Sequence, residues 1–252
     1  MTSVSNAAVG AFLAGNAAAK ARHGMNEAIA RLSTGVRSIY GGDAAGASVA
    51  HTLRADGRSA LMAARNVEDG ISFLQAGESA LLEIAALNTR LRELAVQDLN
   101  AAFLDANQEA AITAEETQIA AAANAIDTAT LNDTALLTAA IAFVRDMDGA
   151  TTSFGAAADL TIASGVTAVD TQMGKISKAL GSMAAGIASL KGHQGTLYAL
   201  SANAEAAAAR IQDTDFARSS ANLAKFSILN QSAMAMVSQA NQANQSVLAV
   251  LQ

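Results

Sequence analysis

The sequence contains no proline, no cysteine and no tryptophan, and aromatic residues make up only 4% of its 252 residues. Ordinary usage would supply about a dozen prolines, at ~5% of residues. Proline breaks the helix ladder, whereas alanine, the dominant apolar residue here, is the best helix former, so the composition predicts long uninterrupted helices. The absence of cysteine excludes a disulfide framework, a thiolate metal site and a cysteine nucleophile.

Charge and hydropathy exclude further classes of protein. The formal net charge is −6 and lysine and arginine form no cluster, which argues against a nucleic-acid partner. No run of about 18 apolar residues occurs, so we expect no membrane insertion. No positively charged segment precedes the first apolar residues, so we expect no cleaved secretory signal, and export must use another route.

Both ends of the chain repeat apolar residues at alternating steps of three and four, the spacing of a coiled-coil seam. The N-terminal seam joins Val4, Met25 and Leu32 through a row of alanines, and the C-terminal seam starts at Phe226. We predict that the two seams mediate self-assembly. The residues chosen for this polymerisation seam are Val4, Met25, Leu32, Phe226, Leu229, Met236, Ala240, Val247 and Val250.

The flanks of these seams are uncharged, because residues 1–19 and 226–252 contain no acidic or basic side chain. A solvated helix surface normally carries charges, and a membrane-surface helix would be expected to carry lysine or arginine. A helix over residues 215–251 would be about 55 Å long, and one partner helix covers only one stripe of it. We therefore expect other copies of the chain to cover the rest.

Between the ends, helical and β-type patterns alternate. Glycines and β-favouring residues at 33–46 predict a connector. A helix is expected to end near residues 100–107 and a second one to occupy residues 108–129. Short β-type runs at 141–145 and 160–163 predict a small hairpin, after which the helical pattern returns. The two apolar stripes of the central helices are Leu81, Ile84, Leu87, Leu91 and Leu94, and Met173, Ile176, Leu180, Ala184, Ile187 and Leu190.

No arrangement of residues indicates catalysis. The three histidines, His23, His51 and His193, are far apart and show no metal-ligand spacing. A Gly-Lys step at Lys175 lacks the earlier glycine of a phosphate-binding loop. We expect no enzyme, no cofactor and no metal site.

Three strings of the sequence are similar to bacterial flagellin. They are "AIARLSTGVRSIYGGDAAGASVA" at residues 28–50, "RNVEDGISFLQAGESALLEIAALNTRLRELAVQ" at 65–97 and "ARIQDTDFARSSANLAKFSILNQSAMAMVSQANQANQSVLAVLQ" at 209–252. The similarity covers an N-terminal and a C-terminal half in the family's order, with only residues 130–172 between them. The chain therefore resembles a short flagellin that consists of the helical core and lacks the variable outer domains.

The resemblance implies a mainly α fold, a long antiparallel helical bundle or coiled coil in which the N- and C-terminal helices pair. It implies an inner coiled-coil domain of residues 1–46 with 212–252, and an outer helical domain of residues 47–211. A β-hairpin is expected at about residues 137–165, and residues 33–46 would form a spoke between the two domains. In flagellins the inner domain lines the central tube of the filament.

The function implied by the resemblance is that of a structural subunit of the bacterial flagellar filament, which polymerises through its terminal helices into a propeller for swimming. Implied partners are further copies of the chain, an export chaperone on the C-terminal helix, and the filament cap and hook-junction proteins. The implied location is extracellular, after type III export. Some flagellins are also bound by a vertebrate Toll-like receptor, and Arg90, Leu94 and Glu115 match its contact positions.

Two alternatives remain open at this point. One is the hook-filament junction protein of the same superfamily, and the other is a secreted helical adhesin or ligand that acts as a monomer. The chain also departs from the family pattern, because Ala243 stands where flagellins usually have proline. Without proline, we expect the last helix to be straighter.

Overall fold

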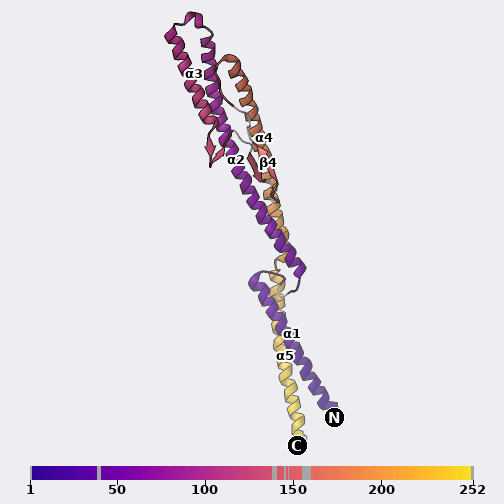
Figure 1. The fold of residues 1–252 in the computed structure, drawn as a ribbon. Coiled ribbons are helices and arrows are strands. Elements are labelled where there is room, and N and C mark those ends of the chain that lie inside the picture. Colours follow the sequence, from indigo (N-terminus) through magenta and orange to yellow (C-terminus); the bar gives the residue numbers. More distant parts are fainter. Residues whose placement is uncertain are drawn as a thin grey trace. The chain divides into compact units, whose positions relative to one another are not determined.

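The computed structural model describes residues 2–38, 41–137, 141–144, 146, 148–154 and 160–250, apart from the side chains of residues 2–8, 101, 141, 154, 247, 248 and 250. The helical elements are α1 (Thr2–Thr34), α2 (Ala44–Asp98), the short 3-10 turn η1 (Ala101–Phe103), α3 (Ala106–Asp127), α4 (Val166–Gln212) and α5 (Phe216–Val250) (Figure 1). The mainly α fold predicted from the sequence, with paired terminal helices and small antiparallel strand pairs, is confirmed.

The chain forms two compact units. We call Met1–Ala55 with Ala204–Gln252 the terminal unit, and Asp56–Asn203 the central unit. The boundary between them falls inside α2 and inside α4. The inner domain predicted from the sequence, residues 1–46 with 212–252, is a narrower division and stays a prediction.

The central unit is a helical bundle in which α4 and α3 pack against α2. Leu81 and Leu91 of α2 are fully buried with Ile176 of α4, which confirms the predicted apolar stripe on α2. On α4 the predicted Ala184 is exposed, and the neighbouring Met183 is buried instead. Both positions lie about two turns from Ile176, and the larger apolar side chain fills the interface. A second cluster contains Ala60, Ala63, Ala64, Val67, Ile71, Leu74, Ile187, Leu190 and Leu197.

Two short antiparallel strand pairs also lie in the central unit. β3 (Ile141–Val144) pairs with β4 (Thr151–Phe154), and β1 (Thr130–Leu131) pairs with β2 (Thr134–Ala135). The first predicted strand of the hairpin is therefore present, but the second one, residues 160–163, is wrong. The β1–β2 pair was not predicted from the sequence.

The segment that was wrongly predicted as a strand is apolar for another reason. Leu160 is 0% exposed and Ile162 is 5% exposed, and both belong to the main core cluster of the helices. The backbone N–H of Ile162 donates to Asn124 Oδ1 of α3 at 3.0 Å, so its donor is satisfied by a side chain and not by a strand. Residue 145, the end of the first predicted strand, lies outside the described residues.

The break between α2 and α3 is fixed by a capping box. Asp105 Oδ1 accepts hydrogen bonds from the backbone N–H groups of Asn107 and Gln108, each at 2.8 Å. In return, the backbone N–H of Asp105 donates to Gln108 Oε1 at 3.1 Å. These bonds satisfy backbone N–H groups in the first turn of α3, which have no partner within the helix. The turn between Asp98 and Ala106 forms the tip of the α2–α3 pair.

Candidate assembly and recognition surfaces

The terminal helices α1 and α5 pack side by side in antiparallel directions (Figure 1). The row of α1 that was predicted as a seam faces α5, with Ala18 and Ala21 buried and Met25 and Leu32 half-buried. A Cβ added at Gly24 would lie 2.6 Å from the ring of Phe226 on α5. The glycine therefore allows the aromatic ring to lie directly on the backbone of α1.

The C-terminal seam is only partly enclosed within one chain. Ala233 is buried, and Phe226 and Ala240 are half-buried. Leu229 and Met236 lie beside this covered face, at 46% and 62% exposed, and are open to contact by other molecules. The side chains of Val4, Val247 and Val250, which complete the predicted seam, lie outside the described residues.

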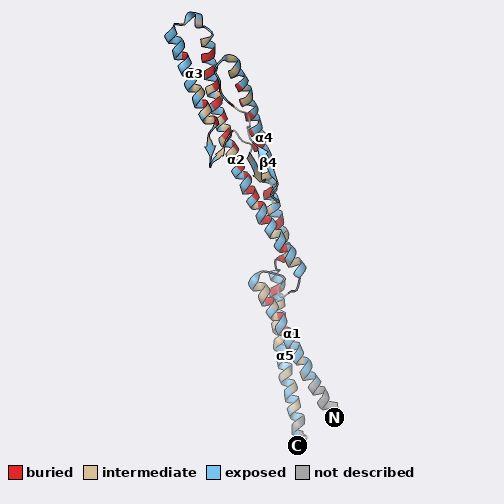
Figure 2. Ribbon diagram, viewed as in Figure 1, coloured by how far each residue is buried: buried red, intermediate tan, exposed pale blue. Residues whose placement is uncertain are grey.

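In the terminal unit the buried apolar residues are small and many of the large ones are exposed. Figure 2 shows how little of α1 and α5 is buried. The buried apolar residues described in this unit are all alanine: Ala18, Ala21, Ala28, Ala50, Ala204, Ala208 and Ala233. The large exposed ones on α1 and α5 are Val9, Phe12, Leu13, Ile29, Phe216, Ile228, Leu229, Met234 and Met236. Exposed apolar surface on this scale marks an interaction site, whereas buried alanines contribute little free energy to the subunit itself.

The predicted spoke is held against the end of α4 by backbone pairing. Val36 forms an antiparallel bridge with Asp213, and the backbone N–H of Arg37 donates to the carbonyl of Gln212 at 2.7 Å. The Arg37 guanidinium also lies 2.7 Å from Asp43 Oδ2. A hydrogen bond from the Gly46 N–H and the charge of Arg37 lower the pKa of Asp43, which caps the start of α2. Residues 39–40 of the spoke lie outside the described residues.

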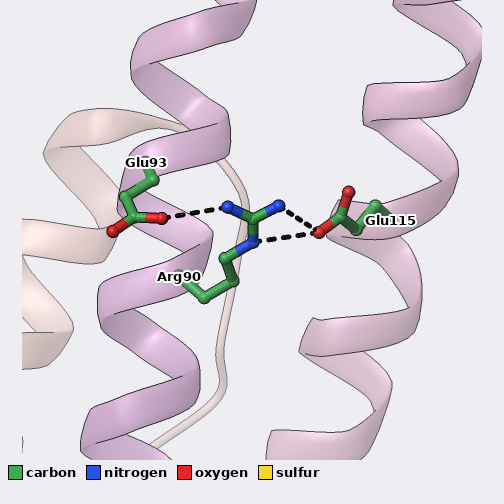
Figure 3. A network of polar contacts seen from close by, with 3 residues as sticks. All are labelled: Arg90, Glu93 and Glu115. Atoms are coloured by element: carbon green, nitrogen blue, oxygen red, sulfur yellow. Dashed lines mark hydrogen bonds and ion pairs between the residues drawn. The ribbon is translucent and has the colours of Figure 1, made fainter.

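A polar cluster joins α2 to α3 on the surface of the central unit (Figure 3). Arg90 Nη2 and Nε donate to Glu115 Oε1 at 2.7 and 3.0 Å, and Arg90 Nη1 donates to Glu93 Oε2 at 3.0 Å. The hydrogen bonds to Glu115 and Glu93 raise the pKa of Arg90. Leu94 lies one turn further along α2 and is only 2% exposed. Arg90 and Glu115 are therefore accessible from outside, and Leu94 is not.

Asn88 and Glu116 are two of the buried polar residues, and neither was predicted from the sequence. Asn88 is 0% exposed within the apolar stripe of α2, and its Nδ2 donates to the carbonyl of Val169 at 3.0 Å. Glu116 of α3 is 8% exposed, and its Oε1 has no hydrogen-bond partner among the described residues. Burial and the nearby negative charge of Asp98 raise the pKa of the Glu116 carboxyl. Asn88 follows Ile84 by four residues, and this spacing is the signal that places it on the buried face.

The described residues offer neither a metal-binding cluster nor a helix that could span a membrane. No cluster of histidine, cysteine, aspartate and glutamate in the described part of the chain could hold a metal ion. None of the described helices has both the length and the apolar character needed to cross a membrane.

Comparison with known proteins decides the family. The model of the bacterial flagellin N-terminal helical region matches residues 6–142, and that of the bacterial flagellin C-terminal helical region matches residues 166–251. The chain belongs to the bacterial flagellin family.

Curated flagellins match over nearly their whole length. The flagellin of Halalkalibacterium halodurans is 33% identical over 248 residues, which cover 89% of this chain and 91% of that protein. The flagellar filament core protein flaB2 of Brachyspira hyodysenteriae is 31% identical and covers 90% of this chain and 92% of its own. The flagellar filament 33 kDa core protein of Treponema phagedenis is also 31% identical, with 88% and 90% covered. These flagellins are accordingly also short.

The residues predicted for function in this flagellin fall on two separate surfaces. The residues of the predicted polymerisation seam belong to α1 and α5 of the terminal unit. Arg90, Leu94 and Glu115 belong to α2 and α3 of the central unit, where Arg90 and Glu115 are joined by an ion pair and Leu94 is part of the core. The exposed side chains of Phe12 and Leu13 were not predicted, although their position in an uncharged helix is a usable signal.

Proposed function

We propose that this chain is a structural subunit of a bacterial flagellar filament and polymerises through its terminal helices. The observation that carries the proposal is the match to both helical regions of flagellin, together with terminal helices that bury alanine and expose larger apolar residues. The names of relatives that match along nearly the full chain describe filament core proteins, which supports the same function.

Polymerisation covers the apolar side chains that a single subunit leaves exposed. Phe12, Leu13, Leu229 and Met236 are between 46% and 70% exposed. Full burial of a side chain of this size contributes about 1.5 to 3 kcal/mol. Several such contacts per subunit, repeated along a helical array, stabilise the polymer although each subunit alone leaves its ends uncovered. Val4, Val247 and Val250 belong to the seam that was predicted from the sequence.

Other partners of the chain act during its export and at the two ends of the filament. The chain reaches the extracellular filament by type III export, in an unfolded state, and an export chaperone covers α5 before that step. Its exposed apolar side chains, such as Ile228 and Met236, suit a helix-in-groove contact of this kind. The filament cap and the hook-junction proteins contact the two ends of the polymer.

Recognition by a vertebrate Toll-like receptor would use the surface that carries Arg90 and Glu115. Their side chains are 51% and 45% exposed, so both can exchange their mutual ion pair for contacts to another protein. Leu94 is buried beneath that surface, so its side chain is not accessible to a receptor in this structure. Loss of receptor activation in Arg90→Ala, with normal filament formation, is the expected result in a reporter-cell assay.

Seeded polymerisation of the purified subunit tests the main proposal. We expect the subunit to sediment as filaments after seeding, and electron micrographs of cells to show flagellar filaments that vanish when this chain is removed. The number of copies per flagellum separates a filament subunit, with thousands, from a hook-junction protein, with a single ring. A protein that stays monomeric at all concentrations after seeding would contradict the proposal.

A further inference from the structure

The paired terminal helices form a groove of about 310 Å³ between them. Its lining is apolar apart from two lysines, and consists of Ala17, Lys20 and Ala21 of α1 and Lys225, Phe226 and Leu229 of α5. The ring of Phe226 lies against the backbone of Gly24, and Leu229 is 46% exposed. Pockets for small ligands measure about 300 to 1,000 Å³, so this groove has the size for one small ligand.

The two lysines of the groove have no anion beside them. Neither Lys20 nor Lys225 forms an ion pair among the described residues. No acidic residue lines the groove, and the sequence contains no aspartate or glutamate in residues 1–26 and 216–252. Glu27, the first acidic residue of the chain, pairs with Arg31 instead. The groove therefore combines apolar surface with positive charge that the subunit does not neutralise.

This combination decides among the possible occupants of the groove. The same helices of a second copy bring apolar side chains but no aspartate or glutamate in residues 1–26 and 216–252, so they supply no anion to the lysines. A neutral apolar ligand supplies none either. A ligand with one carboxylate and one alkyl chain meets both requirements, because the carboxylate accepts charge-assisted hydrogen bonds and the chain covers apolar surface.

We propose that this groove binds a long-chain alkyl carboxylate, that is, a free fatty acid. Its carboxylate lies against Lys20 and Lys225, and its alkyl chain lies along Phe226 and Leu229. The alkyl stems of the two lysines add apolar contact at the carboxylate end. Binding to the free subunit does not depend on the proposed function. A consequence for assembly does, because Phe226 and Leu229 belong to the predicted polymerisation seam, and an occupied groove competes with polymerisation.

Isothermal titration calorimetry of the free full-length subunit with sodium dodecanoate, below the concentration at which it forms micelles, tests the proposal. We expect a single saturable site. Octanoate should bind at least about tenfold more weakly, because each buried methylene group contributes about fourfold in affinity. Dodecyltrimethylammonium has the same alkyl chain but the opposite charge, and should show no saturable binding. Equal affinity for the anionic and the cationic amphiphile would contradict a role for the lysines.

Paired substitutions locate the site on the helices. Lys20→Gln combined with Lys225→Gln should lower the affinity for dodecanoate about tenfold. The matched control is Arg22→Gln combined with Arg218→Gln, which removes the same charge from the same two helices at exposed positions outside the groove. The control should bind within about twofold of the wild type. Circular dichroism should show equal helix content in both variants. Equal losses of affinity would mean general attraction to a cationic surface and would overturn the proposal.

Seeded polymerisation measures the consequence for assembly. Dodecanoate should raise the critical concentration of the wild-type chain, and should leave that of the double lysine variant unchanged. Wild-type chain that binds dodecanoate but never forms filaments would contradict the proposed function and leave the fatty-acid site intact.

The absence of saturable dodecanoate binding would overturn the fatty-acid site and leave the filament function intact. Vesicles that contain an anionic phospholipid provide the remaining comparison, and we expect the free subunit not to sediment with them. Sedimentation with these vesicles that requires both lysines, without saturable binding of dodecanoate, would assign the lysines to a lipid surface and would also overturn the proposal.

Discussion

The terminal and central units bury different kinds of residue, although both are pairs or bundles of long helices. The central unit places Leu81, Ile84 and Leu91 at zero exposure against α4. The terminal unit buries alanines and leaves Phe12, Ile228 and other large apolar residues exposed. Because stabilisation by burial follows apolar area, we expect burial to stabilise the central unit within a free subunit, and we propose that the terminal unit gains most of its stabilisation from other copies.

The exposed apolar surface of the terminal unit also accounts for its uncharged helices. A charged flank would remain solvated in a free subunit, but it would be costly to bury in the polymer. Residues 1–19 and 226–252 avoid that cost, whereas α2 and α3 carry the charged clusters, such as Arg90 with Glu93 and Glu115. We therefore propose that charged surfaces stay in solvent and that the uncharged ones are covered after assembly.

The largest effect on a single subunit is expected in the central core. Leu91→Ala removes a fully buried side chain and should lower the free energy of unfolding of the free subunit by about 2 to 5 kcal/mol. Urea denaturation measures this value. The matched change Leu229→Ala on α5 should alter it by less than about 0.5 kcal/mol. Equal losses in the free energy of unfolding from Leu91→Ala and Leu229→Ala would contradict the difference in burial between the two units.

A substitution at an exposed residue of α5 should instead weaken polymerisation and leave the free subunit unchanged. Met236→Asp changes an exposed residue, so the urea midpoint of the free subunit should stay the same. In the filament an unpaired buried charge costs about 3 to 5 kcal/mol, so the critical concentration should rise by about a hundredfold or more. Met236→Leu is the control and should polymerise normally. Normal filaments from the aspartate variant would show that Met236 remains in solvent.

A smaller effect is expected where α1 and α5 approach most closely. Gly24→Ala places a methyl group against the Phe226 ring and should cost the α1–α5 pair about 1 kcal/mol. Gly10→Ala, whose new Cβ has no neighbour within 4 Å, should instead favour helix by up to about 1 kcal/mol. Circular dichroism of the free subunits would show helix content lowered in the first and raised in the second. Identical changes in helix content for the two variants would exclude close packing of α1 against α5 at Gly24.

The smallest effect concerns pH and the buried carboxyl of the central unit. The pKa of Glu116 is raised in the folded state, so folding favours the protonated form and stability falls as pH rises through that pKa. Glu116→Gln should therefore stabilise the subunit at neutral pH, and the gain should disappear in acid. Urea denaturation at the two pH values measures it. A gain that persists at low pH would contradict the role of the charge.

Much of the fold could be predicted from spacing alone. The row from Met25 to Leu32 and the stripe through Leu91 were predicted from steps of three and four, because alanine-rich helices without proline keep one register over many turns. The family and its filament function could be identified from three strings of residues. The resemblance predicted two domains, but the unit boundary inside α2 and α4 has no signal in the sequence, because both helices run through it without a break.

Other features depend on tertiary packing, which periodicity does not report. The run at Leu160 has β-type composition, but in the fold it is buried in the helical core and is not a strand. On α5 the spacing includes both the residues that face α1, such as Ala233, and the exposed Leu229 beside them. A helix that is apolar around most of its circumference carries no signal that separates an intramolecular face from an intermolecular one.

Hydrogen exchange of the free subunit and of the filament tests most directly the claim that assembly completes the terminal unit. We expect amides of residues 81–94 in α2 to be strongly protected in both states, because their core is present in each. Amides of residues 229–240 in α5 should exchange rapidly in the free subunit and become protected in the filament. Protection of residues 229–240 that is equally strong in the free subunit would contradict the account.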